Sequence, residues 1–474
     1  MNVFPHVPPK FLLRVLPLAL TIRLAMLNNI LQRDLVLGRW AAVCSNAGVL
    51  CLLVLLGGCS ILPGHWRSGW NEPWPTGTPV PDTAGSWKLT DLEQEDGRFV
   101  ALAISGGGSR AANFGAAVML ELQRRGLLEQ VDVISGVSGG TLPAVYYGLG
   151  DKAGAFTEPS VRQAFGYDFQ SSWIRRWFLP QNIFRYWLSD FTRSDIMVQV
   201  FNNSLFHNAT FADLRPHPKI LLNSTIHNDH TRFTFTDDRF VALHSILATY
   251  HVANAVNASS AFPGAFQDVT LQTYVEPPQY LHLYDGGPID NLGIQGIVEY
   301  LNRNILGSTL DRLFPKGCVI IIIDATPASE HPELSAGESS RAFIDHFVDT
   351  NALDAMDAML SESRRSLLSR MGIPVEKQDQ EIRGRLPVND PHQCGCEVRH
   401  VSLRHLLYGG ESDDPELGER VTQIKTRFWI TKEEQDDLFQ AAKLIVKVLD
   451  DQRLLSDSSF KIPCTSVTTS KPPD

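Results

Sequence analysis

Two short glycine-rich segments, 147 residues apart, carry side chains suited to nucleophilic catalysis. Residues 136–140 read GVSGG, and their glycines permit a sharp strand-to-helix turn that would expose the hydroxyl of Ser138. Residues 285–293 begin with Asp-Gly-Gly, which places the carboxylate of Asp285 in a tight turn. A serine hydroxyl becomes a strong nucleophile only when a base takes its proton. The pair predicts Ser138 as nucleophile and Asp285 as general base, with no histidine required.

A third segment could stabilise the negative charge that such a reaction develops. Gly106, Gly107 and Gly108 follow an apolar run and precede a helical pattern, which leaves consecutive N–H groups available to an anion. In acyl transfer that anion is the oxyanion of the tetrahedral intermediate. A nucleotide phosphate loop is disfavoured, because no Lys-Ser/Thr pair follows the glycines and the Gly-x-Gly-x-x-Gly spacing is absent.

A histidine-containing triad is a second alternative, and the sequence leaves it open. His282 precedes Asp285 by three residues and is expected to be a strand side chain rather than a catalytic base. None of the later histidines follows an evident strand end; they are His331, His346, His392, His400 and His405.

Alternating strand and helix patterns must position these residues. We expect strands at 99–104, 131–135, 219–226, 232–236, 280–284 and 318–323, and helices at 111–125, 141–149, 342–371 and 432–449. The last helix follows a capping sequence, Thr431 to Glu434. This order predicts an α/β fold with a mostly parallel central sheet between two layers of helices.

Residues 160–215 interrupt this pattern with a tryptophan-, phenylalanine- and arginine-rich insert. One interpretation is a helical subdomain that buries its aromatic rings. The other is a cap over an acyl pocket, with aromatic rings that can lie at a bilayer interface.

The N-terminal region predicts export and lipidation. The apolar run 49–56 follows Arg33 and Arg39 and ends in Leu-Gly-Gly-Cys-Ser at 56–60, which is typical of a bacterial lipobox. Residues 1–58 would then be a signal peptide, with translation beginning at Met26 as one hypothesis, and Cys59 would carry the lipid. The alternative is an uncleaved signal anchor. Because Ser60 follows the cysteine, we expect a lipid-anchored protein of the bacterial cell envelope, at the outer membrane facing the periplasm.

Charge argues against nucleic acid as a partner. The whole chain has a net charge of −10, and residues 59–474 hold 37 basic and 51 acidic residues. Such a surface repels polyanions, so a lipid anchor rather than a basic patch is expected to hold the protein at a membrane.

The cysteines predict one disulfide and no metal site. Cys318 opens an apolar strand and is expected to be an inert core thiol. In an oxidising compartment, one disulfide is expected among Cys394, Cys396 and Cys464. A metal site that used His392 would need ligands that the sequence does not offer, and no cofactor is expected.

These motifs, in this order, resemble those of the patatin-like phospholipases. The glycine triplet with Arg110, the serine turn and the Asp-Gly-Gly turn all correspond, and residues 257–264 (NASSAFPG) are similar to a segment between the family's serine and aspartate. The lipobox is similar to that of the family's bacterial lipoprotein branch.

The resemblance implies a three-layer α/β/α fold with a Ser138–Asp285 dyad and an oxyanion hole at Gly106, Gly107 and Gly108. Arg110 would either hold helix and loop together or attract a phosphate head group, and the residues at 290 and 291 would order the turn. The implied activity is hydrolysis of lipid acyl esters through an acyl-serine; the alternative is a catalytically silent lipoprotein that binds lipid or a partner.

The expected organisation follows from these assignments. It comprises a signal peptide (1–58), a lipidated cysteine and tether (59–88), a catalytic domain (89–330) with its cap insert (160–215), a C-terminal extension of the same domain (331–450) and a tail (451–474).

Overall fold

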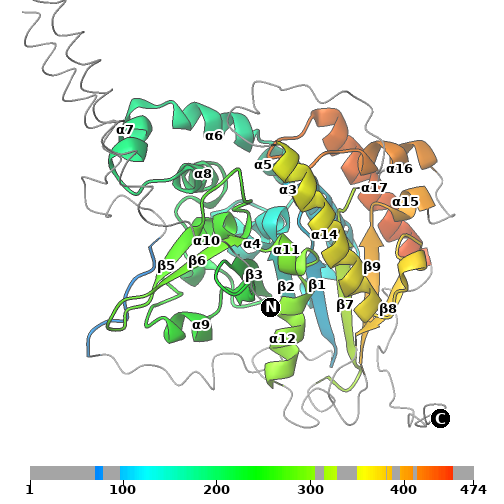
Figure 1. The fold of residues 1–474 in the computed structure, drawn as a ribbon. Coiled ribbons are helices and arrows are strands. Elements are labelled where there is room, and N and C mark those ends of the chain that lie inside the picture. Colours follow the sequence, from blue (N-terminus) through cyan, green and yellow to red (C-terminus); the bar gives the residue numbers. More distant parts are fainter. Residues whose placement is uncertain are drawn as a thin grey trace, which may run out of the picture. The chain divides into compact units, whose positions relative to one another are not determined.

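The computed structural model describes residues 70–77, 97–304, 314–327, 350–380, 382–386, 395–408 and 414–451 (Figure 1). The chain divides into a larger unit, 65–183 with 191–474, and a smaller unit, 1–64 with 184–190. The smaller unit is described only at 184–190, where helix α7 (Pro180–Leu188) ends and Tyr186 meets Trp187 edge to face. The predicted signal peptide and Cys59 lie outside the described residues. No helix in the described ranges is long and apolar enough to cross a bilayer.

The larger unit is built on a mixed sheet in which five neighbouring strands run parallel. The strand order is β5-β6-β3-β2-β1-β7-β9-β8, with β4 paired to β3. Strands β3, β2, β1, β7 and β9 are parallel, and the flanking strands are antiparallel. The strands are β1 (Phe99–Ile104), β2 (Val133–Val137), β3 (Lys219–Ile226), β4 (Arg232–Thr234), β5 (Val269–Gln272), β6 (Tyr280–Asp285), β7 (Cys318–Asp324), β8 (Arg383–Leu386) and β9 (Cys396–Ser402).

Helices cover both faces of this sheet, so the fold is the predicted three-layer α/β/α arrangement (Figure 1). They include α3 (Gly108–Arg124), α4 (Thr141–Leu149), α10 (Val252–Ser259), α12 (Ile294–Asn304), α14 (Thr350–Arg370) and α17 (Lys432–Asp451). Side chains alternate across β1: Phe99, Ala101 and Ala103 join a core cluster with α12 and α14, while Ile104 lies against Gly115 of α3. The continuous apolar character of β1 follows from burial on both faces.

Helix boundaries agree closely with the expected ones where a local signal marks them. Helix α17 begins after Thr431, whose hydroxyl accepts the Glu434 N–H at 3.1 Å while the Glu434 carboxylate accepts the Thr431 N–H at 2.9 Å. This is the reciprocal pattern of a capping box. Helix α3 begins inside the glycine triplet, three residues earlier than expected, because Gly108 is already its first residue.

The cysteine predictions were wrong for two residues. Cys318 and Cys396 form a disulfide with a Cα–Cα distance of 4.8 Å, and both are fully buried. Cys396 opens strand β9, which the sequence analysis did not predict, and β9 pairs with β7 in a register that sets these cysteines side by side. Charged residues within β9 concealed it in the sequence. Cys394 and Cys464 lie outside the described residues.

The insert at 160–215 is helical, with α5 (Glu158–Phe165), α6 (Phe169–Trp177) and α8 (Arg193–Phe201) in the larger unit. Its aromatic residues divide between core and surface. Trp173 is buried, with its ring centroid 5.2 Å from that of Phe266. Phe178 is 59% exposed, and Leu179 and Ile183 are also exposed. Each of the two interpretations of the insert therefore has residues that fit it.

Candidate active site

Ser138 lies at the turn between β2 and α4, in a short 3-10 helix (Ser138–Gly140). Its backbone has a φ of +49°, a strained conformation for a residue with a side chain. The neighbouring glycines are required, because a Cβ on Gly139 would lie 2.1 Å from the carbonyl oxygen of Gly108. On Gly140 it would lie 2.5 Å from that of Ile104. The strained turn and close packing fix the Ser138 hydroxyl at the end of β2.

Asp285 lies at the end of β6, and its Oδ2 accepts a hydrogen bond from Ser138 Oγ at 2.8 Å. Strand β3 separates β2 from β6, and β6 runs antiparallel to it with Asp285 opposite Ser224. The other carboxylate oxygen, Oδ1, accepts the Gly287 N–H at 2.8 Å. In the described part of the chain, Ser138 Oγ has no histidine partner.

Burial raises the pKa of Asp285 to about 6, and the hydrogen bonds from Gly287 and Ser138 act in the opposite direction. The carboxylate is therefore mostly ionised at neutral pH. An ionised carboxylate can accept the serine proton directly.

The glycine loop lies directly against Ser138. A Cβ on Gly106 would lie 3.3 Å from the Ser138 Cβ. The Gly106 N–H donates to the Asn291 carbonyl at 2.9 Å, so this amide is already satisfied within the protein. Within the described residues, the N–H groups of Gly107 and Gly108 have no such acceptor, and both glycines have positive φ values. Two of the three predicted oxyanion donors are thus available.

The segment that holds these residues matches a known protein family. Residues 102–297 match the family model described as patatin-like phospholipase. This segment is a patatin-like phospholipase domain. No curated protein sequence matches the chain.

Solved structures with a similar arrangement are distant in sequence. Human GIVD cytosolic phospholipase A2 is 12% identical, with a TM-score of 0.47, and the match covers 78% of this chain and 61% of that one. The same enzyme in complex with methyl γ-linolenyl fluorophosphonate is 13% identical, with a TM-score of 0.42 and coverages of 77% and 60%. VipD from Legionella pneumophila is 12% identical, with a TM-score of 0.28 and coverages of 75% and 67%. The chain thus spans about three-fifths of the length of the human enzyme.

Arg110 of the patatin-like domain is buried and bonded to protein groups. Its Nε donates to the Ala325 carbonyl at 2.6 Å, one Nη donates to the Ile424 carbonyl, and the other contacts Thr426 Oγ1 at 3.2 Å. These contacts fasten α3 to two loops from later in the chain. This geometry favours the interpretation in which Arg110 holds helix and loop together over the one in which it attracts a phosphate head group.

The turn after Asp285 is ordered by the two residues that the sequence indicated. Both carboxylate oxygens of Asp290 accept N–H groups at the start of α12, from Ile294 at 3.1 Å and Gln295 at 2.8 Å. Burial raises the pKa of Asp290. The Asn291 carbonyl holds the glycine loop as described above.

Two residues that hold the Ser138 turn in place were not predicted. Ser259 Oγ accepts the Ser138 N–H at 2.9 Å and donates to the Asn223 carbonyl. The Asn223 side chain donates to Ser135 Oγ at 2.8 Å and to the Gly136 carbonyl at 3.1 Å. Ser259 lay in the segment at 257–264 that resembles the family, and that segment was the available signal. Nothing near Asn223 in the sequence marked it.

The remaining candidate residues lie elsewhere. His282 is a strand residue whose Nδ1 is 3.0 Å from Thr270 Oγ1. His400 and His405 lie beside each other, and His400 contacts Asp324 rather than Ser138. The other three histidines lie outside the described residues. Over the described ranges, no group of three or more potential metal ligands is present.

Proposed function

We propose that this chain is a membrane-anchored serine acyl-ester hydrolase that releases fatty acid from lipids. The observation that carries the proposal is the 2.8 Å hydrogen bond from Ser138 Oγ to a buried carboxylate, Asp285, beneath the glycine loop. The patatin-like match supports a lipid substrate.

The reaction proceeds through an acyl-serine. Ser138 Oγ attacks the ester carbonyl carbon while Asp285 takes the hydroxyl proton. The N–H groups of Gly107 and Gly108 stabilise the oxyanion, and the proton on Asp285 passes to the departing alcohol. A water molecule then attacks the acyl-serine while Asp285 takes one of its protons. Fatty acid leaves, and the proton on Asp285 returns to Ser138 Oγ.

Lipidation at Cys59 would hold the enzyme at the bacterial envelope, where its substrates are. The buried Cys318–Cys396 disulfide supports export, because structural disulfides persist in oxidising compartments such as the periplasm. We also propose placement at the outer membrane, because Ser60 follows Cys59.

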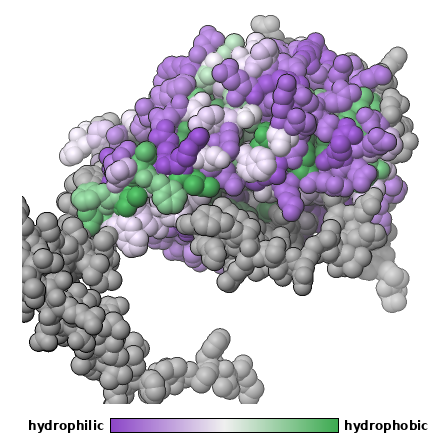
Figure 2. All heavy atoms as spheres, turned by 90° about the horizontal axis from the view of Figure 1, so that it is seen from above, coloured by the Kyte–Doolittle hydropathy of each residue, from purple (hydrophilic) through white to green (hydrophobic). Residues whose placement is uncertain are grey.

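The exposed apolar residues of the insert would meet the lipid surface. Phe178, Leu179 and Ile183 are exposed next to Arg175 and Arg176, a pairing that suits an interface between hydrocarbon and anionic head groups. Figure 2 shows hydrophobic side chains gathered at one side of an otherwise mainly hydrophilic face. We expect Phe178→Ser to reduce hydrolysis of vesicle lipid severalfold while leaving hydrolysis of a soluble short-chain ester unchanged.

Labelling with a fluorophosphonate serine probe tests the dyad. We expect the wild type to label, Ser138→Ala to remain unlabelled, and Asp285→Asn to label far more slowly. Ser160→Ala, which changes a partly exposed serine bonded to Thr157, is a matched control and should label normally. Full labelling of Ser138→Ala would refute the assignment of the nucleophile. A folded wild type that neither labels nor hydrolyses lipid in vesicles would favour a catalytically silent lipoprotein.

A further inference from the structure

We propose that helix α14 is a positioning element that holds the turn of Asp285 and the glycine loop in register, through Leu360 and Ser363 on one side and a buried Arg364–Asp324 ion pair on the other. The proposal rests on the proposed function of the dyad. Helix α14 follows the segment matched by the family model, which ends at residue 297.

The first contact is with the turn that carries the base. A Cβ on Gly287 would lie 2.5 Å from Leu360 Cδ2 and 3.1 Å from Asp285 Oδ1, so Leu360 closes this turn from outside. Ser363 Oγ donates to the Ile289 carbonyl at 3.4 Å, in the short helix α11 (Gly287–Asp290). Helix α14 therefore packs on the residues that follow Asp285.

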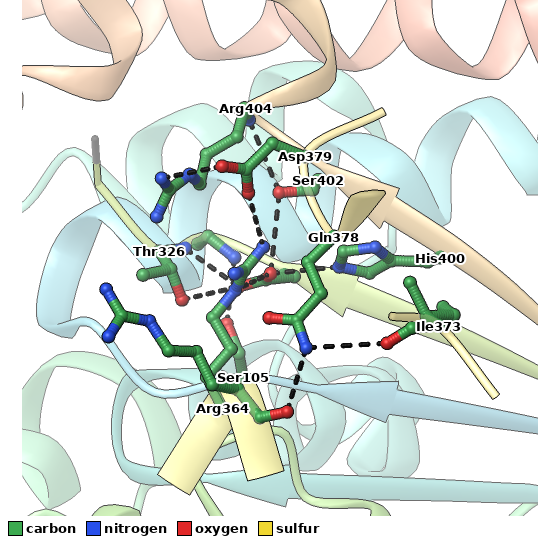
Figure 3. A network of polar contacts seen from close by, with 12 residues as sticks. Ser105, Thr326, Arg364, Ile373, Gln378, Asp379, His400, Ser402 and Arg404 are labelled. Carbon is green, nitrogen blue, oxygen red and sulfur yellow. Dashed lines mark hydrogen bonds and ion pairs between the residues drawn. The ribbon is translucent and has the colours of Figure 1, made fainter. Parts of the chain in front are cut away.

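The second contact is with the end of β7. Arg364 Nε donates to Asp324 Oδ2 at 2.6 Å, and His400 Nε2 lies 2.9 Å from the same oxygen. Figure 3 shows Arg364, His400 and Thr326 converging from separate elements. Arg364 and His400 hold the pKa of Asp324 well below its usual range, although burial alone would raise it. The carboxylate is therefore ionised and fixed on several sides.

Asp324 is joined directly to the residue that clamps the glycine loop. The N–H of Ala325 donates to Ser105 Oγ at 2.9 Å, and the Ala325 carbonyl accepts from Arg110 Nε at 2.6 Å. Ser105 directly precedes the loop, and Arg110 follows it by two residues. A shift of Asp324 would consequently displace Ala325 and both ends of the glycine loop.

Residues 360, 363 and 364 are spaced i, i+3 and i+4, so they lie on one face of α14. The following turn directs Leu367 and Leu368 into the core cluster beneath the sheet. A buried ion pair gives little net stability compared with well-packed apolar residues. Its placement between the two halves of the site indicates a geometric role.

The test compares Arg364→Met with variants of the same helix. We measure kcat and KM for a soluble ester, the labelling rate with the fluorophosphonate probe, and thermal unfolding of each full-length protein. Arg364→Met should lower kcat and the labelling rate by about 10- to 100-fold with little change in KM, since a 1 Å misplacement can reduce catalysis by about 10²-fold. Arg364→Lys should recover part of the loss.

Two controls separate positioning from stability. Arg365→Met changes the adjacent exposed arginine, which lies 3.8 Å from Glu362, and should behave as wild type. Leu368→Ala removes core packing from α14 and should lower the unfolding temperature without lowering kcat below that temperature. If Arg364→Met alone fails to fold, the double variant Asp324→Asn/Arg364→Met takes its place in the test, because it removes both charges of the ion pair.

The outcomes distinguish failure of the positioning role from failure of the proposed dyad. A folded Arg364→Met protein, or double variant, that labels at the wild-type rate overturns the positioning role while leaving the dyad intact. Equal losses of labelling in Leu368→Ala and Arg364→Met at equal losses of stability overturn it as well. A wild type that does not react with the probe removes the proposed function itself and, with it, this role.

Discussion

Replacing Asp285 by asparagine should slow catalysis severely and at the same time stabilise the fold. Burial raises the pKa of Asp285 from 3.8 to about 6. The folded protein therefore binds this proton more tightly than the unfolded chain, and the contribution of Asp285 to stability is lost as pH rises from about 4 through 6. Asparagine carries no charge at any of these pH values and can still accept the Gly287 N–H.

The expected gain follows from the two pKa values. Relative to wild type, Asp285→Asn should raise the free energy of unfolding by about 1.5 kcal/mol at pH 5 and about 3 kcal/mol at pH 8, because one pKa unit corresponds to about 1.4 kcal/mol. Urea denaturation of both proteins at the two pH values measures this difference. Comparing the two proteins at the same pH cancels the titration of other groups.

The pH dependence of wild-type activity is a second test of the Asp285 carboxylate. About a tenth of Asp285 is ionised at pH 5 and about nine-tenths at pH 7, so kcat/KM and labelling should rise roughly tenfold over this range. A stability gain for Asp285→Asn that is equal at pH 5 and pH 8, or a loss at both, would contradict the inferred burial of an ionised carboxylate. A flat activity profile would contradict its role as the base.

Three further perturbations address the scaffold around the dyad. Ser259→Ala leaves the Ser138 N–H without its acceptor, and should lower the unfolding free energy by about 1–3 kcal/mol and slow labelling. Ser260→Ala removes a buried hydroxyl that has no partner among the described residues and should be close to neutral by both measures. Gly108→Ala should abolish labelling, because its Cβ would lie 2.4 Å from the Arg427 carbonyl oxygen, while Gly126→Ala, also at positive φ but in open space, should keep full activity and lose only about 1 kcal/mol; normal labelling of Gly108→Ala would contradict this close packing. Replacing both cysteines of the 318–396 disulfide by alanine should lower the unfolding free energy by about 2–4 kcal/mol in denaturation curves, and unchanged stability would show that the bridge does not constrain the chain.

The sequence predicted best those parts of the fold that local patterns determine. Strand β1 and helix α4 have the expected bounds, because an unbroken apolar run and a helix after a glycine turn are local features. The serine and aspartate segments were found for the same reason, since each requires glycines at fixed positions. Their approach to 2.8 Å depends on the strand order β6-β3-β2, which no local pattern encodes.

The strand and the disulfide that the sequence analysis did not predict share a physical cause. Strand β9 carries Arg399 and His400, both buried, and such residues mask the apolar run that indicates a strand. Their burial is tolerated because Glu397 pairs with Arg399 and Asp324 with His400. Glu397 lies in β9 itself and Asp324 lies in β7, so pairing within the strand and across the sheet stabilises buried charged residues that conceal the strand in the sequence. The same strand explains the misassigned disulfide.

Residues outside the segment that matches the family model also support the site. Arg427 accepts the Ser109 N–H through its carbonyl at 2.8 Å and lies against Gly108, and the next residue, Phe428, accepts the N–H of Gln170 in α6 through its own carbonyl at 3.1 Å. One short C-terminal loop thus supports both the glycine loop and the insert. In the proposed reaction the N–H groups of Gly107 and Gly108 point at a developing charge, and we expect this backing to fix their direction. In the proposed reaction residues 106–285 carry the chemistry, and we expect its geometry to depend on α14 and on the loop before α17.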